Sequence, residues 1–146
     1  YLYQADQQDD WGNVERCLNL LRQRLPELTE VPVSERSMDR GWQYAVKIIR
    51  GVCSQRGILD EHLGDCATNW TVARMSIIDR NILRLAAYEL LFSDAVPDAT
   101  VIDEAIELAK EFGHKDSTRF VNGVLDRFLQ VMPEWRESGT RSPDSV

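Results

Sequence analysis

The side chains in this sequence best suited to catalysis or metal binding are two histidines and three cysteines. His62 and His114 form no H-x-x-x-H or H-E-x-x-H pair, so the helical zinc motif is missing. Cys17, Cys53 and Cys66 form no C-x-x-C pair and are odd in number, which argues against a disulfide framework and a thiolate zinc site. We predict that these cysteines are small buried hydrophobes in a reducing compartment, most simply the cytoplasm, and that the protein binds no metal or cofactor.

Other catalytic patterns are missing as well. The chain has no Gly-rich phosphate loop, no G-x-S-x-G turn and no Rossmann fingerprint. Adjacent carboxylates such as Asp103 and Glu104 point about 100° apart on a helix, so they do not share one substrate. Glu107 and Lys110 fit an ordinary ion pair on a solvated helical face. We therefore predict that the protein is not an enzyme.

The residues around Phe120 are suited to another kind of chemistry, the binding of single-stranded RNA. Lys115, Arg119 and Arg127 supply positive charge, and Phe120 lies on a different face from the main apolar stripe of its helix. A half-exposed aromatic side chain beside cations is what a stacking site for an unpaired base requires. The same pattern fits the edge of an ordinary core, so both interpretations stay open.

The Asn122-Gly123 pair conflicts with its surroundings. The dipeptide is a turn signal, yet it lies inside a clear helical period. A glycine in a helix interior costs about 1 kcal/mol relative to alanine. Such a conflict indicates either a close helix–helix contact or a functional surface, and the sequence favours neither.

Helices must position these residues, because apolar residues recur with a helical period and no segment alternates with period two over the length of a strand. We predict an all-α fold with helices over about residues 11–25, 34–53, 58–67, 75–92, 100–112 and 117–132. The apolar stripes predicted for the last three helices are Ile78, Ile82, Leu85, Ala86, Leu90, Val101, Ala105, Ile106, Ala109, Phe112, Val121, Val124, Leu125, Phe128 and Met132.

Glycine, proline and short polar residues mark the predicted boundaries. Gly57 is expected to kink or end a helix, and Pro133 to end the last one. Gly113 stands where a left-handed C-terminal cap is expected. Asp116 or Ser117 can cap the last helix by accepting a hydrogen bond from an exposed backbone N–H.

The length of 146 residues suits a single domain, which we place at residues 1–134, with a polar tail at 135–146 that is expected to lack fixed structure. No apolar run approaches the roughly 20 residues that cross a bilayer, and no signal peptide is visible, so we expect no membrane association. The net charge of −7 disfavours a nucleic-acid binder when taken alone. A local basic patch can still act inside an acidic protein.

Three motifs make the chain resemble one known family. They are RNILRLAAYELL at residues 80–91, IDEAIELAKEFG at 102–113 and FVNGVLD at 120–126. In their order and spacing they are similar to the motif helices of the NusB transcription antitermination family, and LYQ at residues 2–4 resembles the end of its first helix. The resemblance is specific over residues 70–129 and weaker in the first half.

The resemblance implies a fold of two helical subdomains packed across one another, here about residues 1–68 and 74–132. It also implies a function without catalysis. NusB proteins pair with the ribosomal protein NusE, bind the boxA element of ribosomal RNA transcripts, and help RNA polymerase in the antitermination complex to read through terminators. A homodimer is also compatible, because an apolar surface that fits NusE could fit a second copy.

The resemblance carries an RNA-binding role to five residues. Phe120 would stack on a base, and Asp116 would accept a hydrogen bond from a base edge or cap the helix. Arg119 and Asn122 lie beside them in the last helix. Arg84, the arginine of the LR motif, could pair either with a phosphate or with a carboxylate of the core.

Two further residues fall where the family contacts NusE. They are Tyr3 and Asp79, and Asp79 stands in place of a more typical glutamate. The family also has an Arg-rich segment at the start of its first helix, and we expect such a segment to precede Tyr1. Two alternatives remain: the NusB-like RNA-binding part of an RNA cytosine methyltransferase, and a helical adaptor that does not bind RNA.

Overall fold

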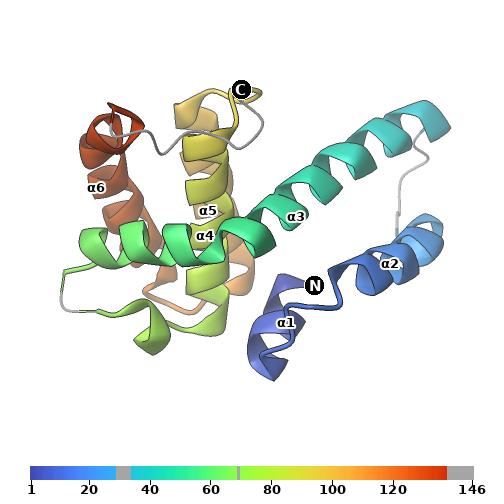
Figure 1. Cartoon of the computed structure of the whole chain (residues 1–146), viewed down its shortest axis with the longest axis horizontal. Coiled ribbons are helices and arrows are strands. Elements are labelled where there is room, and N and C mark those ends of the chain that lie inside the picture. The colour runs from blue at the N-terminus through green and yellow to red at the C-terminus, as the bar shows by residue number, and fades with distance from the viewer. Residues whose placement is uncertain (29–33, 69, 138–146) are drawn as a thin grey trace. The chain divides into compact units, whose positions relative to one another are not determined.

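The computed structural model describes residues 1–28, 34–68 and 70–137, which form helices and contain no strand (Figure 1). The elements are α1 (Leu2–Gln8), α2 (Val14–Leu28), α3 (Glu35–Cys66), the short 3-10 helix η1 (Val72–Arg74), α4 (Ile77–Phe92), α5 (Asp98–Phe112) and α6 (Ser117–Glu137). The all-α fold class is therefore confirmed. In the described ranges, no helix is both long and apolar enough to cross a membrane. Most of the predicted tail, residues 138–146, lies outside them.

The chain divides into two compact units, Tyr1–Ser54 and Gln55–Val146, and α3 contributes residues to both. In the first unit, a charged pair ties α2 to α3. Arg50 donates two hydrogen bonds of 2.7 and 2.7 Å to the carboxylate of Glu15. These bonds hold the pKa of Glu15 below its usual value. The pair is exposed, so it contributes little to stability.

In the second unit, α4, α5 and α6 each pack against the other two (Figure 1). Ala86 and Ala87 of α4 are 4% and 0% exposed, and their small side chains allow neighbouring helices to approach closely. Phe128 of α6 is fully buried, and burying such a side chain contributes about 1.5–3 kcal/mol. The predicted α6 stripe is buried throughout, at Val121, Val124, Leu125, Phe128 and Met132.

The predicted stripes of α4 and α5 need correction. Phe112 is 56% exposed rather than inward, because it is the last residue of α5 and extends beyond the last buried residue of that helix, Ala109. Ile78, Leu85 and Ile106 are only half-buried. In α4 the burial instead includes three polar or charged side chains, which are Asp79, Asn81 and Arg84. Apolar periodicity does not detect them.

Two predicted helix ends are wrong. Gly57 does not end α3, which continues to Cys66 and keeps Leu59 and Leu63 fully buried beyond the glycine. Burial of these leucines outweighs the helix-propensity cost of about 1 kcal/mol. The last helix also continues past Pro133 to Glu137. Ring packing in the last turn holds it in place, since Trp135 stacks on His62 and lies edge-on to Phe128, with centroids 3.9 and 4.9 Å away.

Candidate nucleic-acid interface

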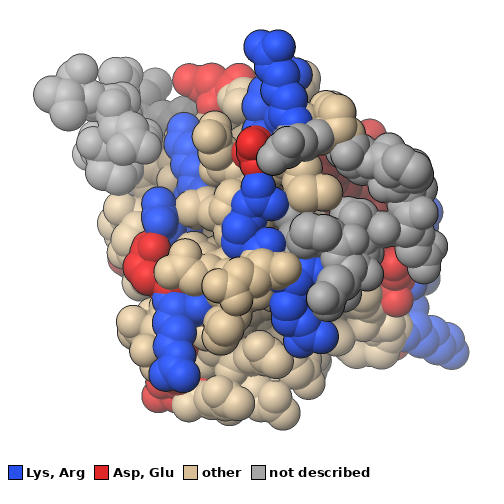
Figure 2. Space-filling view, turned by 90° about the vertical axis from the view of Figure 1, so that its right-hand side faces the viewer, with Lys and Arg blue, Asp and Glu red and all other residues tan. Residues whose placement is uncertain are grey.

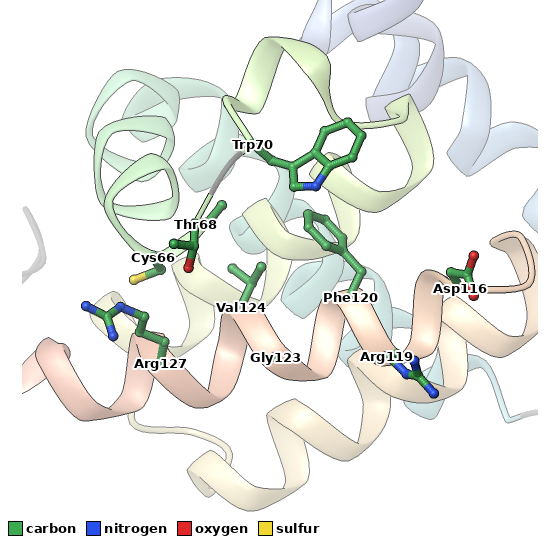
Figure 3. A pocket seen from close by; sticks show the side chains of 10 residues that line it. Cys66, Thr68, Trp70, Asp116, Arg119, Phe120, Gly123, Val124 and Arg127 are labelled. Carbon is green, nitrogen blue, oxygen red and sulfur yellow. The ribbon is translucent and has the colours of Figure 1, made fainter.

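A groove of about 590 Å³ follows α6 in the second unit (Figure 3). One wall has residues at positions 116, 119, 120, 123, 124 and 127. Steps of three and four residues place these positions along one helical face. The other wall comes from the end of α3 and the segment that follows it, and its residues are Cys66, Ala67, Thr68 and Trp70.

Two aromatic rings meet across this groove. Phe120 leaves α6 half-buried and points toward Trp70, whose indole comes from the opposite wall and is 48% exposed (Figure 3). The ring centroids are 6.4 Å apart, with an angle of 70° between the planes. The guanidinium of Arg74 lies 5.6 Å from the centroid of Trp70. Phe120 is therefore the half-exposed aromatic residue that the sequence indicated.

Gly123 lies in the same groove with open space in front of it. The residue is exposed, and a Cβ added there would find no atom within 4 Å outside its own helix. This rules out a close helix–helix contact as the reason for the glycine. The alternative explanation for the Asn122-Gly123 pair, a functional surface, stays a prediction. Asn122 is exposed too and lines a second, adjacent groove.

The second groove has a volume of about 490 Å³ and shares Asp116 and Arg119 with the first. Together the two grooves carry three cations, Lys115, Arg119 and Arg127, and one carboxylate, that of Asp116. This surface is therefore locally positive in a chain of net charge −7. Basic side chains likewise reach the surface in several separate groups on the face shown in Figure 2.

A tight turn between α5 and α6 positions Lys115 and Asp116. Gly113 has an extended backbone, with φ −84° and ψ −177°, so the predicted left-handed cap is wrong. A glycine is needed for another reason: a Cβ there would lie 2.5 Å from the side chain of Ser117 and 2.6 Å from a backbone carbonyl oxygen of α5. Ser117, which is fully buried, accepts a hydrogen bond of 2.9 Å from the backbone N–H of His114. It therefore closes the turn, and this bond does not cap the first turn of α6.

Four of the five predicted RNA-binding residues lie together, and Arg84 does not. Asp116, Arg119, Phe120 and Asn122 line one or both grooves. Arg84 is 5% exposed and donates hydrogen bonds of 2.8 and 2.9 Å to the carboxylate of a neighbouring residue of α3, Asp60. The structure thus shows Arg84 paired with a core carboxylate, the second of the two roles considered for it.

The two predicted NusE contacts differ in accessibility. Tyr3 is 46% exposed on α1. Asp79 is only 3% exposed, and one of its carboxylate oxygens lies 3.4 Å from Nε2 of His114. In the described part of the chain, its other oxygen is buried without a hydrogen-bond partner. Tyr3 is therefore open to a partner, whereas Asp79 is enclosed.

Trp70 is the groove residue that sequence reasoning did not assign to the site. The sequence did contain an indication of this role, because a large aromatic residue between two helices must either anchor its segment or stay exposed to a ligand. The groove holds a cysteine as well, but burial raises the pKa of the Cys66 thiol to about 11, so it stays protonated and unreactive at neutral pH. Within the described ranges, no cluster of side chains could hold a metal ion.

Comparison with known proteins places the chain in one family. The NusB family profile matches residues 2–130. The chain is 41% identical to the transcription antitermination protein NusB of Streptomyces avermitilis, over 80% of this chain and 75% of that protein. It is 39% identical to the protein of the same name from Beutenbergia cavernae, over 93% of this chain and 86% of that protein.

A solved structure gives the same result. The structure of T. maritima NusB matches with a TM-score of 0.67 and 35% sequence identity, covering 88% of this chain and 82% of that one. The sequence and the helical fold of this chain are thus both similar to those of NusB proteins. The chain belongs to the NusB family of transcription antitermination proteins.

Proposed function

We propose that this protein binds boxA-type single-stranded RNA through the two grooves along α6, acts together with NusE, and promotes read-through of ribosomal RNA operons in the cytoplasm. The observation that carries the proposal is the half-exposed ring of Phe120 in an open groove lined by cations. Unpaired bases are bound by stacking on aromatic rings, and their backbone is held by positive charge. The open space in front of Gly123 leaves room for a ligand beside Phe120.

In this proposal the two grooves bind different parts of the RNA. A base stacks on Phe120 in the first groove, where Asp116 at its end accepts a hydrogen bond from a base edge. Lys115 and Arg119 in the second groove, with Arg127 farther along α6, contact phosphates. Asn122 adds a polar contact without charge. Arg84 has no part in RNA binding here, because its guanidinium is buried against a carboxylate.

For NusE we propose Tyr3 as the more accessible contact, because its ring is exposed on α1. The enclosed carboxylate of Asp79 would bind a partner only after its surroundings, including His114, rearranged. A Tyr3→Ala variant is expected to bind NusE more weakly without losing helical structure. Unchanged binding of NusE by this variant would remove Tyr3 from the interface.

Fluorescence anisotropy with a labelled boxA-type RNA tests the proposal, with and without NusE and over a range of salt concentrations. Three phosphate contacts on single-stranded RNA predict that log K falls with log salt with a slope of about −2. We expect tighter binding when NusE is present, and weaker binding to an unrelated RNA. Binding that showed neither sequence preference nor salt dependence would contradict the RNA-binding function.

A further inference from the structure

Trp70 exposes nearly half of its side chain at the rim of the first groove. Single exposed apolar residues are common on protein surfaces and need no explanation by themselves. Trp70 differs because its ring contacts the ring of Phe120, the residue proposed to stack on a base. Its other ring contact is with Arg74, a cation 5.6 Å from the ring centroid.

The spacing of the two ring centroids would suit a single base once the rings lie parallel. Bases stack at about 3.4 Å, so a base held between two parallel rings needs a separation of about 6.8 Å. The centroids of Trp70 and Phe120 are 6.4 Å apart. The planes now meet at 70°, so one ring must turn to become parallel. Trp70 is the freer of the two, since Phe120 is half-buried on α6.

The space around the rings is compatible with an inserted base. Gly123 has no side chain to fill the groove beside Phe120, and nothing outside its own helix lies within 4 Å of where a Cβ would be. Figure 3 shows the two rings on opposite walls, with the side chain of Arg119 directed away from them. Arg119 thus does not block the two rings and stays available to a phosphate.

We propose that Trp70 and Phe120 form a clamp that holds one unpaired base of a single-stranded RNA between their rings. This inference rests on the proposed RNA-binding function and names a second stacking residue for it. The ligand is an unpaired nucleobase, because a base within a duplex is already stacked on its neighbours. Stacking between rings tolerates any base, since every base has an aromatic face. The clamp therefore adds affinity for any base, and polar groups such as Asp116 supply the preference for particular bases.

A double-mutant cycle tests the clamp. The full chain carrying Trp70→Leu, Phe120→Leu or both is titrated with a boxA-type single-stranded RNA by fluorescence anisotropy, after circular dichroism has confirmed folding. Each single variant should bind about 5- to 150-fold more weakly, as expected for losing one stacked base. The double variant should lose much less than the product of the two, because both rings hold the same base. Trp70→Phe, which keeps a ring, should bind nearly as well as the wild type.

Phe112→Leu is the matched control, because Phe112 is also an exposed aromatic residue of the second unit but lines neither groove. Its RNA affinity should equal that of the wild type. If Phe120→Leu weakens binding and Trp70→Leu does not, the clamp is refuted while RNA binding at α6 stands. Losses that multiply in the double variant would also refute it, since the rings would then hold separate bases. A wild-type protein without salt-dependent RNA binding would overturn the proposed function, and the clamp with it.

Discussion

At the scale of residues, Gly123 is a position where the needs of the helix and of the proposed RNA site differ. The helix would be more stable with a side chain at this position, because glycine is a poor helix former and the space in front of it is open. Gly57 is equally open in α3, so the open space alone does not mark a binding surface; Gly123 differs because it lines a groove. The groove beside Phe120 is where the proposed RNA would approach.

We therefore expect Gly123→Ala to increase the free energy of unfolding by about 1 kcal/mol. The same variant should bind boxA-type RNA about tenfold more weakly, since the added methyl group narrows the groove. Chemical denaturation and anisotropy titration measure the two effects. Gly57→Ala is the control, because Gly57 is also exposed and open within a helix but lies outside both grooves. It should stabilise the protein and leave RNA affinity unchanged; equal RNA affinity in both variants would assign Gly123 no binding role.

Arg84 illustrates the opposite case, a charged residue whose role is structural. Removing one partner of a fully buried ion pair costs about 3–5 kcal/mol. Its partner Asp60 has a side chain that is 29% exposed. For Arg84→Met we therefore expect the free energy of unfolding to fall by a smaller amount, about 2–3 kcal/mol. Arg50→Met is the control, because Arg50 makes the same two-bond contact with a carboxylate at the exposed surface. Chemical denaturation should show a smaller decrease in the free energy of unfolding for this variant. A weaker RNA affinity of folded Arg84→Met would return this residue to the RNA site.

At the scale of elements, the turn between α5 and α6 is a sterically constrained connection. For Gly113→Ala we expect a loss of about 1–3 kcal/mol in the free energy of unfolding, because the new Cβ would overlap Ser117 and a backbone carbonyl of α5. The backbone angles at Gly113 are ones that alanine adopts readily, so the loss is purely steric. Thermal and chemical denaturation measure it. A variant as stable as the wild type would show that the turn can relax.

The helices themselves were largely predictable from the sequence, and their ends and polar burial were not. Apolar period alone located the α6 stripe, whose five predicted residues are all buried. It could not show that α3 continues past Gly57 and α6 past Pro133, because tertiary packing outweighs local helix propensity at both positions. The burial of Arg84 depends on a carboxylate in another helix, 24 residues earlier in the chain. No local pattern reveals such a pairing.

The candidate site was predictable on α6 but not on its opposite wall. Phe120, Arg119 and Arg127 share one helix, so helical geometry brings them together. Trp70 reaches the same groove from a different segment, and only the fold brings it within 6.4 Å of Phe120. The motif residues pointed to the family, and the structure supplied the second wall.

For the molecule as a whole, His62 makes stability depend on pH. Burial lowers the pKa of this imidazole below its usual value of 6.5, against the opposing effect of Glu61 and Asp65. In the unfolded chain the residue takes up a proton near its usual pKa, so the unfolded state binds more protons below about pH 6.5. The stability contributed by neutral His62 is thus fully present above that pH and is lost as the pH falls through the folded pKa.

Thermal denaturation at about pH 7.5 and at about pH 5.5 tests this linkage. We expect the wild type to lose more stability on acidification than His62→Phe, which keeps a ring against Trp135 but has no proton to bind. All other titratable groups are common to both proteins and cancel in the comparison. Equal acid sensitivity of the two proteins would show that His62 does not contribute.

The continuation of α6 past Pro133 also has a consequence for how fast the protein refolds. About 10–30% of unfolded chains have a given bond before proline in the cis form, whereas the described part of this structure has no cis peptide bond. Such chains must isomerise, over tens of seconds, before the last turn of α6 can bring Trp135 onto His62. A fraction of the molecules should therefore refold in a slow phase that is limited by this bond. A prolyl isomerase should shorten the phase, and Pro133→Ala should remove the contribution of this bond.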